Sequence, residues 1–282
     1  MTFVTANDRV NLFYNDWGSG DPVVLMHGWP LDSSMWSDQA VFLAERGQRV
    51  VTYDRRGFGR SDQPWDGYDF DTLADDLGAL LEQLGLRDVT LVGFSMASGE
   101  VARYLSRHGS TRIARVALVA TDTPYLLKAD DHPDGVDPAQ LEAMVAGLRK
   151  DRPHFLKGFS DTFYGNVALK NNVSPEMMAW TQQMGMRASA RATLSCVEAI
   201  FTTDFRPDMA AFDVPTLVIH GTADKTSPIE LTGRVTAKAI PGAHLIEYEG
   251  EPHALYATSK DRLNVDLLSF IQTSSPSSGR EK

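Results

Sequence analysis

Cysteine is nearly absent from this sequence, which holds one, Cys196, among its 282 residues. A single thiol excludes an internal disulfide framework and a thiolate zinc cluster, because each of them needs several cysteines. We expect Cys196 to pack as a small apolar side chain.

Long hydrophobic runs and an excess of positive charge are also missing. No stretch approaches the ~20 apolar residues that a membrane span needs, and the N-terminus has neither a basic start nor a long apolar run. The 27 lysines and arginines face 37 aspartates and glutamates, which gives a net charge of −10 and a surface that repels nucleic acid and anionic lipid. We therefore expect a cytoplasmic protein without nucleic-acid or membrane partners, and a homo-oligomer is compatible with this composition.

Short apolar runs alternate with segments of helical composition over the first 120 residues. Helices are predicted at 33–46, 70–84 and 95–107, and buried strands at 23–26, 49–53, 89–92 and 113–119. This alternation predicts an α/β fold with a mostly parallel, doubly wound sheet and helices on both of its faces. The alternating segment 10–14 is expected to form a half-exposed edge strand.

The regular pattern stops after Thr123-Pro124 and resumes with an apolar run at 215–220, followed by a strand at 244–248 and a helix at 260–271. The intervening segment is rich in Met, Phe and Trp and has no strand signals. We expect a helical cap at 125–208 inserted into a core made of 1–124 and 209–272. The serine-rich residues 273–282 are expected to be a disordered tail.

Ser95 lies between a predicted buried strand and a predicted helix, in Gly93-Phe94-Ser95-Met96-Ala97. This context is typical of a strained turn that pushes a serine hydroxyl out above the sheet, with small residues at 93 and 97 allowing close backbone approach. The alternative is a serine that caps the following helix.

An acid and a histidine follow Ser95 in the order that such a fold imposes. Asp224 and His253 each come shortly after a predicted strand, so both should lie at the sheet edge that holds Ser95. A serine becomes a strong nucleophile when an imidazole takes its proton, and a carboxylate fixes the tautomer of that imidazole. Asp122 also follows a strand and competes with Asp224 for the acid, or lines the substrate pocket instead. His253 could also be a loop histidine without function.

Backbone amides are needed to stabilise the negative oxygen of a tetrahedral intermediate. The candidates are the amides of Met96, directly after the serine, and Trp29, in the loop after an early strand. An ordinary strand-ending turn at His27-Gly28 is the alternative.

No cofactor and no metal are expected. The glycines of Asp54-Arg55-Arg56-Gly57-Phe58-Gly59-Arg60-Ser61 lack the spacing of a dinucleotide fingerprint, and we interpret this segment as a loop held by charge pairs. Some large apolar side chains of the cap segment are expected to line an apolar acyl or alcohol pocket, although plain core packing is the alternative: Met144, Met177, Met178, Trp180, Met184 and Met186.

With these residues in hand, the chain resembles the cofactor-free haloperoxidase, aryl esterase and perhydrolase group of α/β-hydrolases. The resemblance spans most of the chain and lies in His27-Gly28-Trp29-Pro30-Leu31, in 53–61, in Gly93-Phe94-Ser95-Met96 with 100–104, and in 264–268. It implies the α/β-hydrolase fold and hydrolysis of small esters. Some members cleave lactams, and some form peracids from a carboxylic acid and hydrogen peroxide.

Three positions near the serine bear on the substrate. Pro30 is similar to the perhydrolase-competent members and is expected in the substrate pocket. Asp122 and Ala97 depart from the group, which has a small apolar residue and a glycine there.

We expect a serine hydrolase that acts on small carboxylic esters through an acyl-enzyme, with perhydrolase side activity. A lactamase or amidase with the same triad and a hydrolase-like receptor with little turnover are the alternatives. Dehalogenation and epoxide opening on the same fold are expected from chains that resemble this one but have an aspartate nucleophile at position 95. Ser95 argues against both reactions.

Overall fold

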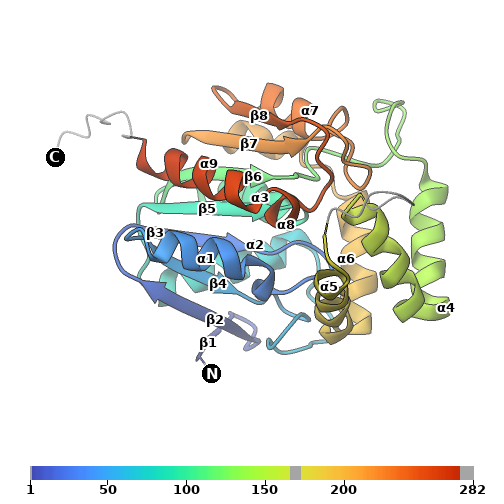
Figure 1. The fold of residues 1–282 in the computed structure, drawn as a ribbon, viewed down its shortest axis with the longest axis horizontal. Helices are drawn as coiled ribbons and strands as arrows, with labels where there is room; N and C mark the ends of the chain where they lie inside the picture. The colour runs from blue at the N-terminus through green and yellow to red at the C-terminus, as the bar shows by residue number, and fades with distance from the viewer. Residues whose placement is uncertain (1, 166–172, 274–282) are drawn as a thin grey trace.

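A computed structural model describes residues 2–165 and 173–273 of the chain, so that the predicted tail lies, from residue 274 on, outside the described residues. Eight strands form one sheet in the order β1-β2-β4-β3-β5-β6-β7-β8 (Figure 1). The first two pairings, β1 with β2 and β2 with β4, are antiparallel, and the others are parallel. The strands are β1 (Thr2–Thr5), β2 (Asn11–Gly18), β3 (Pro22–Met26), β4 (Arg49–Tyr53), β5 (Val89–Phe94), β6 (Ile113–Val119), β7 (Thr216–Gly221) and β8 (His244–Tyr248).

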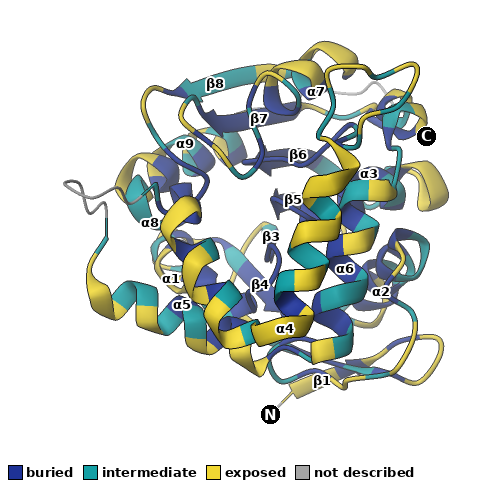
Figure 2. Ribbon diagram, turned by 90° about the vertical axis from the view of Figure 1, so that its right-hand side faces the viewer, coloured by how far each residue is buried: buried dark blue, intermediate teal, exposed yellow. Residues whose placement is uncertain are grey.

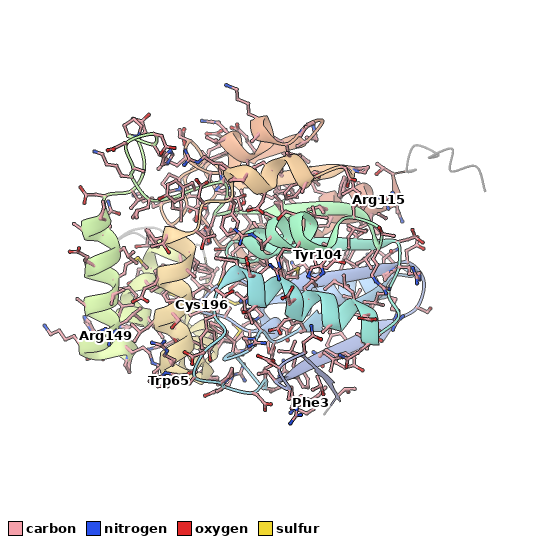
Figure 3. The ribbon with its side chains drawn as sticks, turned by 180° about the vertical axis from the view of Figure 1, so that it is seen from behind. Phe3, Trp65, Tyr104, Arg115, Arg149 and Cys196 are labelled. Carbon is pink, nitrogen blue, oxygen red and sulfur yellow. The ribbon has the colours of Figure 1, made fainter. Side chains whose placement is uncertain are left out.

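Helices cover both faces of the sheet. Helices α1 (Ser37–Ala44) and α9 (Lys260–Gln272) lie in front of it in Figure 1 and pack against each other. Helices α2 (Phe70–Gln83) and α3 (Ala97–His108) cover the opposite face, where Figure 3 shows Tyr104 on α3. Every residue of β5 and β7 is buried, which is why these strands are apolar almost throughout. The predicted doubly wound α/β fold is therefore confirmed.

The antiparallel side of the sheet differs from the prediction. The strand expected at 10–14 extends to Gly18 and is not at the edge, because β1 pairs with its outer side. Strand β1 has four residues, of which only Val4 is buried, so it carries too little alternation to be recognised in the sequence. Two short helices, α7 (Gly233–Ala239) and α8 (Leu255–Thr258), were also not predicted.

Among the described residues between β6 and β7, three α-helices lie in front of the carboxyl ends of the parallel strands (Figure 2). They are α4 (Pro138–Phe163), α5 (Pro175–Arg187) and α6 (Ala190–Thr202), followed by the 3-10 helix η2 (Arg206–Ala211). In the described part of 125–208, only two isolated bridges have strand-like pairing. The division of the chain at 124 and 208 stays a prediction. None of the helices in the described ranges is long and apolar enough to cross a bilayer.

Helix α4 is broken near its middle. Asp151 has extended dihedrals, φ −160° and ψ 85°, and its carboxylate accepts a hydrogen bond from the amide of His154 at 3.0 Å. Pro153 lacks an N–H and is tolerated only in the first turn of a helix. Asp151 therefore caps a second helix, which changes direction and covers the sheet edge.

Candidate active site

Ser95 sits in a strained turn between β5 and α3. Its φ is +54°, a value that L residues rarely adopt, and its amide donates to the carbonyl of Val119 at 2.9 Å. A Cβ on Gly93 would lie 3.0 Å from the carbonyl oxygen of Ala97, so the turn leaves little room for a side chain at position 93. The methyl group of Ala97, by contrast, is fully buried without disturbing the turn. The local sequence thus favours the serine turn.

The structure brings Ser95, His253 and Asp224 into one chain of hydrogen bonds. The Oγ of Ser95 lies 2.9 Å from Nε2 of His253, and Nδ1 of His253 lies 2.6 Å from Oδ2 of Asp224. Asp224 follows β7, and His253 follows β8, so the three side chains reach the site from three strand ends. All three are at most 5% exposed. This geometry can pass a proton from the hydroxyl to the imidazole.

Both carboxylate oxygens of Asp224 have partners. Oδ1 accepts the amides of Thr226 and Ser227, each at 2.8 Å, and Oδ2 accepts from His253. A second histidine, His220 of β7, places Nε2 3.1 Å from Oδ2. Burial works against the charge of Asp224, but His253 and His220 outweigh it and lower the pKa of this carboxyl below its usual range.

His220 also contacts this site, although it was not among the site residues predicted from the sequence. Its Nε2 faces two acceptors, the carboxylate of Asp224 and the carbonyl of Ser227 at 2.8 Å, so this nitrogen carries the proton. A signal was present in the sequence, because a histidine inside a fully buried strand needs a polar partner nearby.

The imidazole of His253 lies between aromatic rings and a carboxylate. Its ring centroid is 5.1 Å from that of Phe94 and 5.2 Å from that of Phe163. Burial lowers the pKa of His253, but the Asp224 carboxylate more than offsets this and raises the pKa above the ordinary histidine value. The ring is therefore a stronger base than a free histidine.

The predicted oxyanion amides lie in loops that meet at the serine. A Cβ added to Gly28 would stand 2.7 Å from the ring of Phe94 and 3.0 Å from Cβ of Ser95, so the loop before Trp29 packs directly on the nucleophile. In the described part of the chain, the amides of Trp29 and Met96 donate no hydrogen bond to another residue. They are therefore free to bind an oxyanion, which is the role that we propose for them.

Charge pairs hold the loops behind these amides. The guanidinium of Arg55 pairs with Glu100 of α3 and donates to the carbonyl of His27 at 2.7 Å, while the Arg55 amide donates to Nε2 of His27 at 2.9 Å. Asp54 accepts the amides of Ser33 and Arg60 at 2.9 and 2.8 Å. This agrees with the interpretation of the segment as a loop held by ion pairs.

Asp122 contacts the nucleophile rather than the base. Its Oδ2 lies 3.2 Å from Oγ of Ser95, and its Oδ1 accepts a hydrogen bond from Oγ of Ser227. Among the described residues, the carboxylate that hydrogen-bonds His253 is that of Asp224. Of the two candidate acids, the geometry therefore supports Asp224 as the one that orients the base.

A cavity of about 790 Å³ extends from Ser95, Trp29 and Asp122 into the space under the helices of the insertion. Its volume suits a small organic molecule. Helix α4 contributes Met144, whereas Pro30 does not line this cavity and borders a separate space of about 10 Å³. Of the other predicted pocket methionines, Met184 is buried in the core and Met186 is exposed.

Among the described residues, no group of three or more His, Cys, Asp or Glu side chains is arranged to hold a metal ion. Cys196 lies on the buried face of α6 and packs in the core, where burial raises the pKa of its thiol to about 12.

Several known proteins are similar to this chain over most of its length. The profile described as alpha/beta hydrolase fold matches residues 21–259. A non-heme chloroperoxidase, CPO-A1, of Kitasatospora aureofaciens is 43% identical over 96% of this chain and 99% of its own length. The bifunctional esterase/perhydrolase DCH of Acinetobacter calcoaceticus is 38% identical over 97% of this chain and all of its own. A bromoperoxidase structure from Bacillus anthracis matches with a TM-score of 0.92 and 44% identity over 96% of this chain and 99% of that one. The chain belongs to the α/β-hydrolase family, in the group of non-heme haloperoxidases and esterase/perhydrolases.

Proposed function

We propose that this protein hydrolyses small carboxylic esters through an acyl-enzyme on Ser95. The hydrogen-bonded chain from Ser95 through His253 to Asp224, placed at the end of a 790 Å³ cavity, is the observation that supports it. An esterase/perhydrolase among the relatives supports the same chemistry. A cytoplasmic location and a homo-oligomeric state stay predictions from the sequence.

The reaction begins when Ser95 Oγ attacks the ester carbonyl and its proton passes to Nε2 of His253. The amides of Trp29 and Met96 stabilise the oxyanion, and Asp224 stabilises the imidazolium. The imidazolium then protonates the alcohol as the carbon–oxygen bond breaks, leaving Ser95 acylated. Water deprotonated by His253 attacks the acyl carbon, releases the acid and returns the proton to Ser95.

Perhydrolysis uses the same intermediate with hydrogen peroxide in place of water. Peroxide gives its proton to His253 and forms a new bond to the acyl carbon, and the peracid leaves as Ser95 regains its proton. Outside the enzyme, the peracid passes an oxygen atom to bromide, which yields the carboxylate and hypobromous acid. The names of the relatives, which include chloroperoxidases, support this second activity.

Hydrolysis of nitrophenyl acetate by the wild type and by Ser95→Ala tests the proposal. We expect multiple turnovers by the wild type and a loss of at least about 10³-fold in kcat for the variant, because no residue replaces the nucleophile. The matched control is Ser98→Ala, since Ser98 is buried in the first turn of α3 and its hydroxyl has no partner among the described residues. Equal rates for wild type and Ser95→Ala would refute the proposal. Perhydrolysis is tested separately by supplying hydrogen peroxide, acetate and bromide together and measuring the hypobromous acid that the released peracid forms.

A further inference from the structure

The mechanism leaves one charged group at the nucleophile without a role, the carboxylate of Asp122. Its side chain lines the cavity beside Ser95, yet the residue is only 7% exposed. Its Oδ1 is held by the hydroxyl of Ser227, whose amide in turn binds Asp224. The Asp122 carboxylate is therefore fixed in place, with Oδ2 3.2 Å from the attacking oxygen.

The carboxylate of Asp122 has no lysine or arginine ion-pair partner within residues 2–165 and 173–273, although Lys225 lines the same cavity. Burial raises the pKa of Asp122, and His253 with the hydroxyls of Ser227 and Ser95 opposes that shift. A buried carboxylate depends on hydrogen-bond donors in such surroundings.

Catalysis removes one of those donors. Ser95 has a single hydroxyl proton, for which His253 Nε2 at 2.9 Å and Asp122 Oδ2 at 3.2 Å compete. When Ser95 attacks, this proton passes to His253, and in the acyl-enzyme Oγ is an ester oxygen without a hydrogen. Oδ2 of Asp122 then faces the acyl group with no donor from Ser95.

We propose that Asp122 is a specificity residue that selects acyl groups bearing an O–H or N–H donor on the carbon next to the carbonyl. That carbon is two bonds from Oγ, so a donor on it is the first part of the acyl chain that can reach Oδ2. The carbonyl oxygen is directed instead toward the amides of Trp29 and Met96. The substrates favoured by this arrangement are 2-hydroxyacyl and 2-aminoacyl esters. This inference rests on the proposed ester hydrolysis.

Esters of 2-hydroxypropanoate and 2-methylpropanoate provide the test, because they differ only in a hydroxyl or a methyl group at the selected carbon. The ratio of their kcat/KM values, measured at about pH 8 with the same leaving group, reports the preference and cancels general losses of activity. We expect the wild-type ratio to fall by about tenfold or more in Asp122→Val, which keeps a side chain of similar shape without a polar group. Asp122→Asn, which retains one acceptor oxygen, should give an intermediate ratio and covers the case in which the valine variant fails to fold.

Two further esters define the donor. The 2-methoxypropanoate ester keeps the oxygen but not its hydrogen, so the proposal requires that its preference over 2-methylpropanoate be lost. The 2-aminopropanoate ester distinguishes a cationic donor from the neutral hydroxyl. Selection by Asp122 is supported if either donor ester is preferred over 2-methylpropanoate by the wild type and this preference is lost in Asp122→Val. An unchanged hydroxyl-to-methyl ratio in both variants overturns the inference while leaving ester hydrolysis intact. Failure of the wild type to turn over any ester would instead refute the proposed function and this inference with it.

Discussion

His253 determines the pH at which the site can work, because its imidazole must be neutral to accept the proton of Ser95. The carboxylates of Asp224 and Asp122 both raise the pKa of this ring, against the effect of burial. The imidazole therefore stays protonated to a higher pH than an ordinary histidine, whose pKa is about 6.5. Activity should be lost as the pH falls through this raised value.

Asp122→Asn should move the acidic limb of the kcat/KM profile to lower pH. The substitution removes a negative charge that favours the imidazolium, so the pKa of His253 falls and the neutral ring persists in more acidic solution. Nitrophenyl acetate hydrolysis between about pH 4 and pH 9 measures the limb, with the exposed Asp213→Asn as the control. A limb that stays in place or moves to higher pH would contradict the assignment.

The sequence identified the residues that meet at the serine because each stands directly after an apolar strand. The carboxyl ends of parallel strands share one sheet edge, so chain order alone brought Ser95, Asp224 and His253 together. It could not decide what Asp122 touches, because the contact with Ser95 depends on side-chain direction at the end of β6. Nor did it reveal that Asp224 is shared between two histidines.

At the scale of elements, the ion pair of Arg55 and Glu100 joins the loop after β4 to helix α3. Both side chains are at most 1% exposed, and the hydroxyl of Tyr53 also donates to Glu100, at 2.9 Å. Desolvation makes such a pair a weak source of net stability, yet loss of one partner leaves a buried charge uncompensated.

Glu100→Gln should therefore lower the free energy of unfolding by about 3 kcal/mol, since the guanidinium of Arg55 stays buried without its counter-charge. Urea denaturation followed by circular dichroism measures the change. The matched control is Glu230→Gln, which removes the charge from an exposed pair with Arg234 and should leave the midpoint unchanged. Similar urea midpoints for the two variants would show that removing the charge of Glu100 destabilises the fold no more than removing that of the exposed Glu230.

Helices and strands with long apolar patterns could be predicted from the sequence, whereas elements of about four residues could not. The all-buried strands β5 and β7 have unmistakable patterns, whereas β1 offers one buried side chain and depends on its pairing with β2. Four-residue α8 has too few residues to show a helical period. Its existence depends on the surrounding core rather than on its own sequence.

At the scale of the whole molecule, the cavity lies between the sheet edge and helices that come from one insertion. Most of the far wall is made by α4 and α6, so their packing determines which acyl or alcohol groups fit. The composition of the insertion and its lack of strand signals indicated helices but not their placement. For that reason Met144 and Pro30, both expected at the pocket, lie in different places.

Gly158→Leu should limit the enzyme to esters with shorter acyl chains. Gly158 lines the cavity, and a Cβ there meets nothing within 4 Å, so a leucine would extend into the empty space. We expect kcat/KM for nitrophenyl hexanoate to fall by about tenfold relative to nitrophenyl acetate, because a clash with one or two methylenes is worth that much. The control is Ala146→Leu, at an exposed position of the same helix. If both variants keep the wild-type ratio of hexanoate to acetate, the longer chain does not occupy this wall.

The strand order has a consequence for the chain as the ribosome makes it. Strand β6 pairs with β5 on one side and, on the other, with β7, which is encoded about 100 residues later. The ribosome adds about 5–20 residues per second, so roughly 5–20 s pass between the synthesis of β6 and that of β7. During this time the backbone N–H and C=O groups on one side of β6 have no partner strand. During synthesis, this growing edge is the place where a neighbouring nascent chain or a chaperone would bind first.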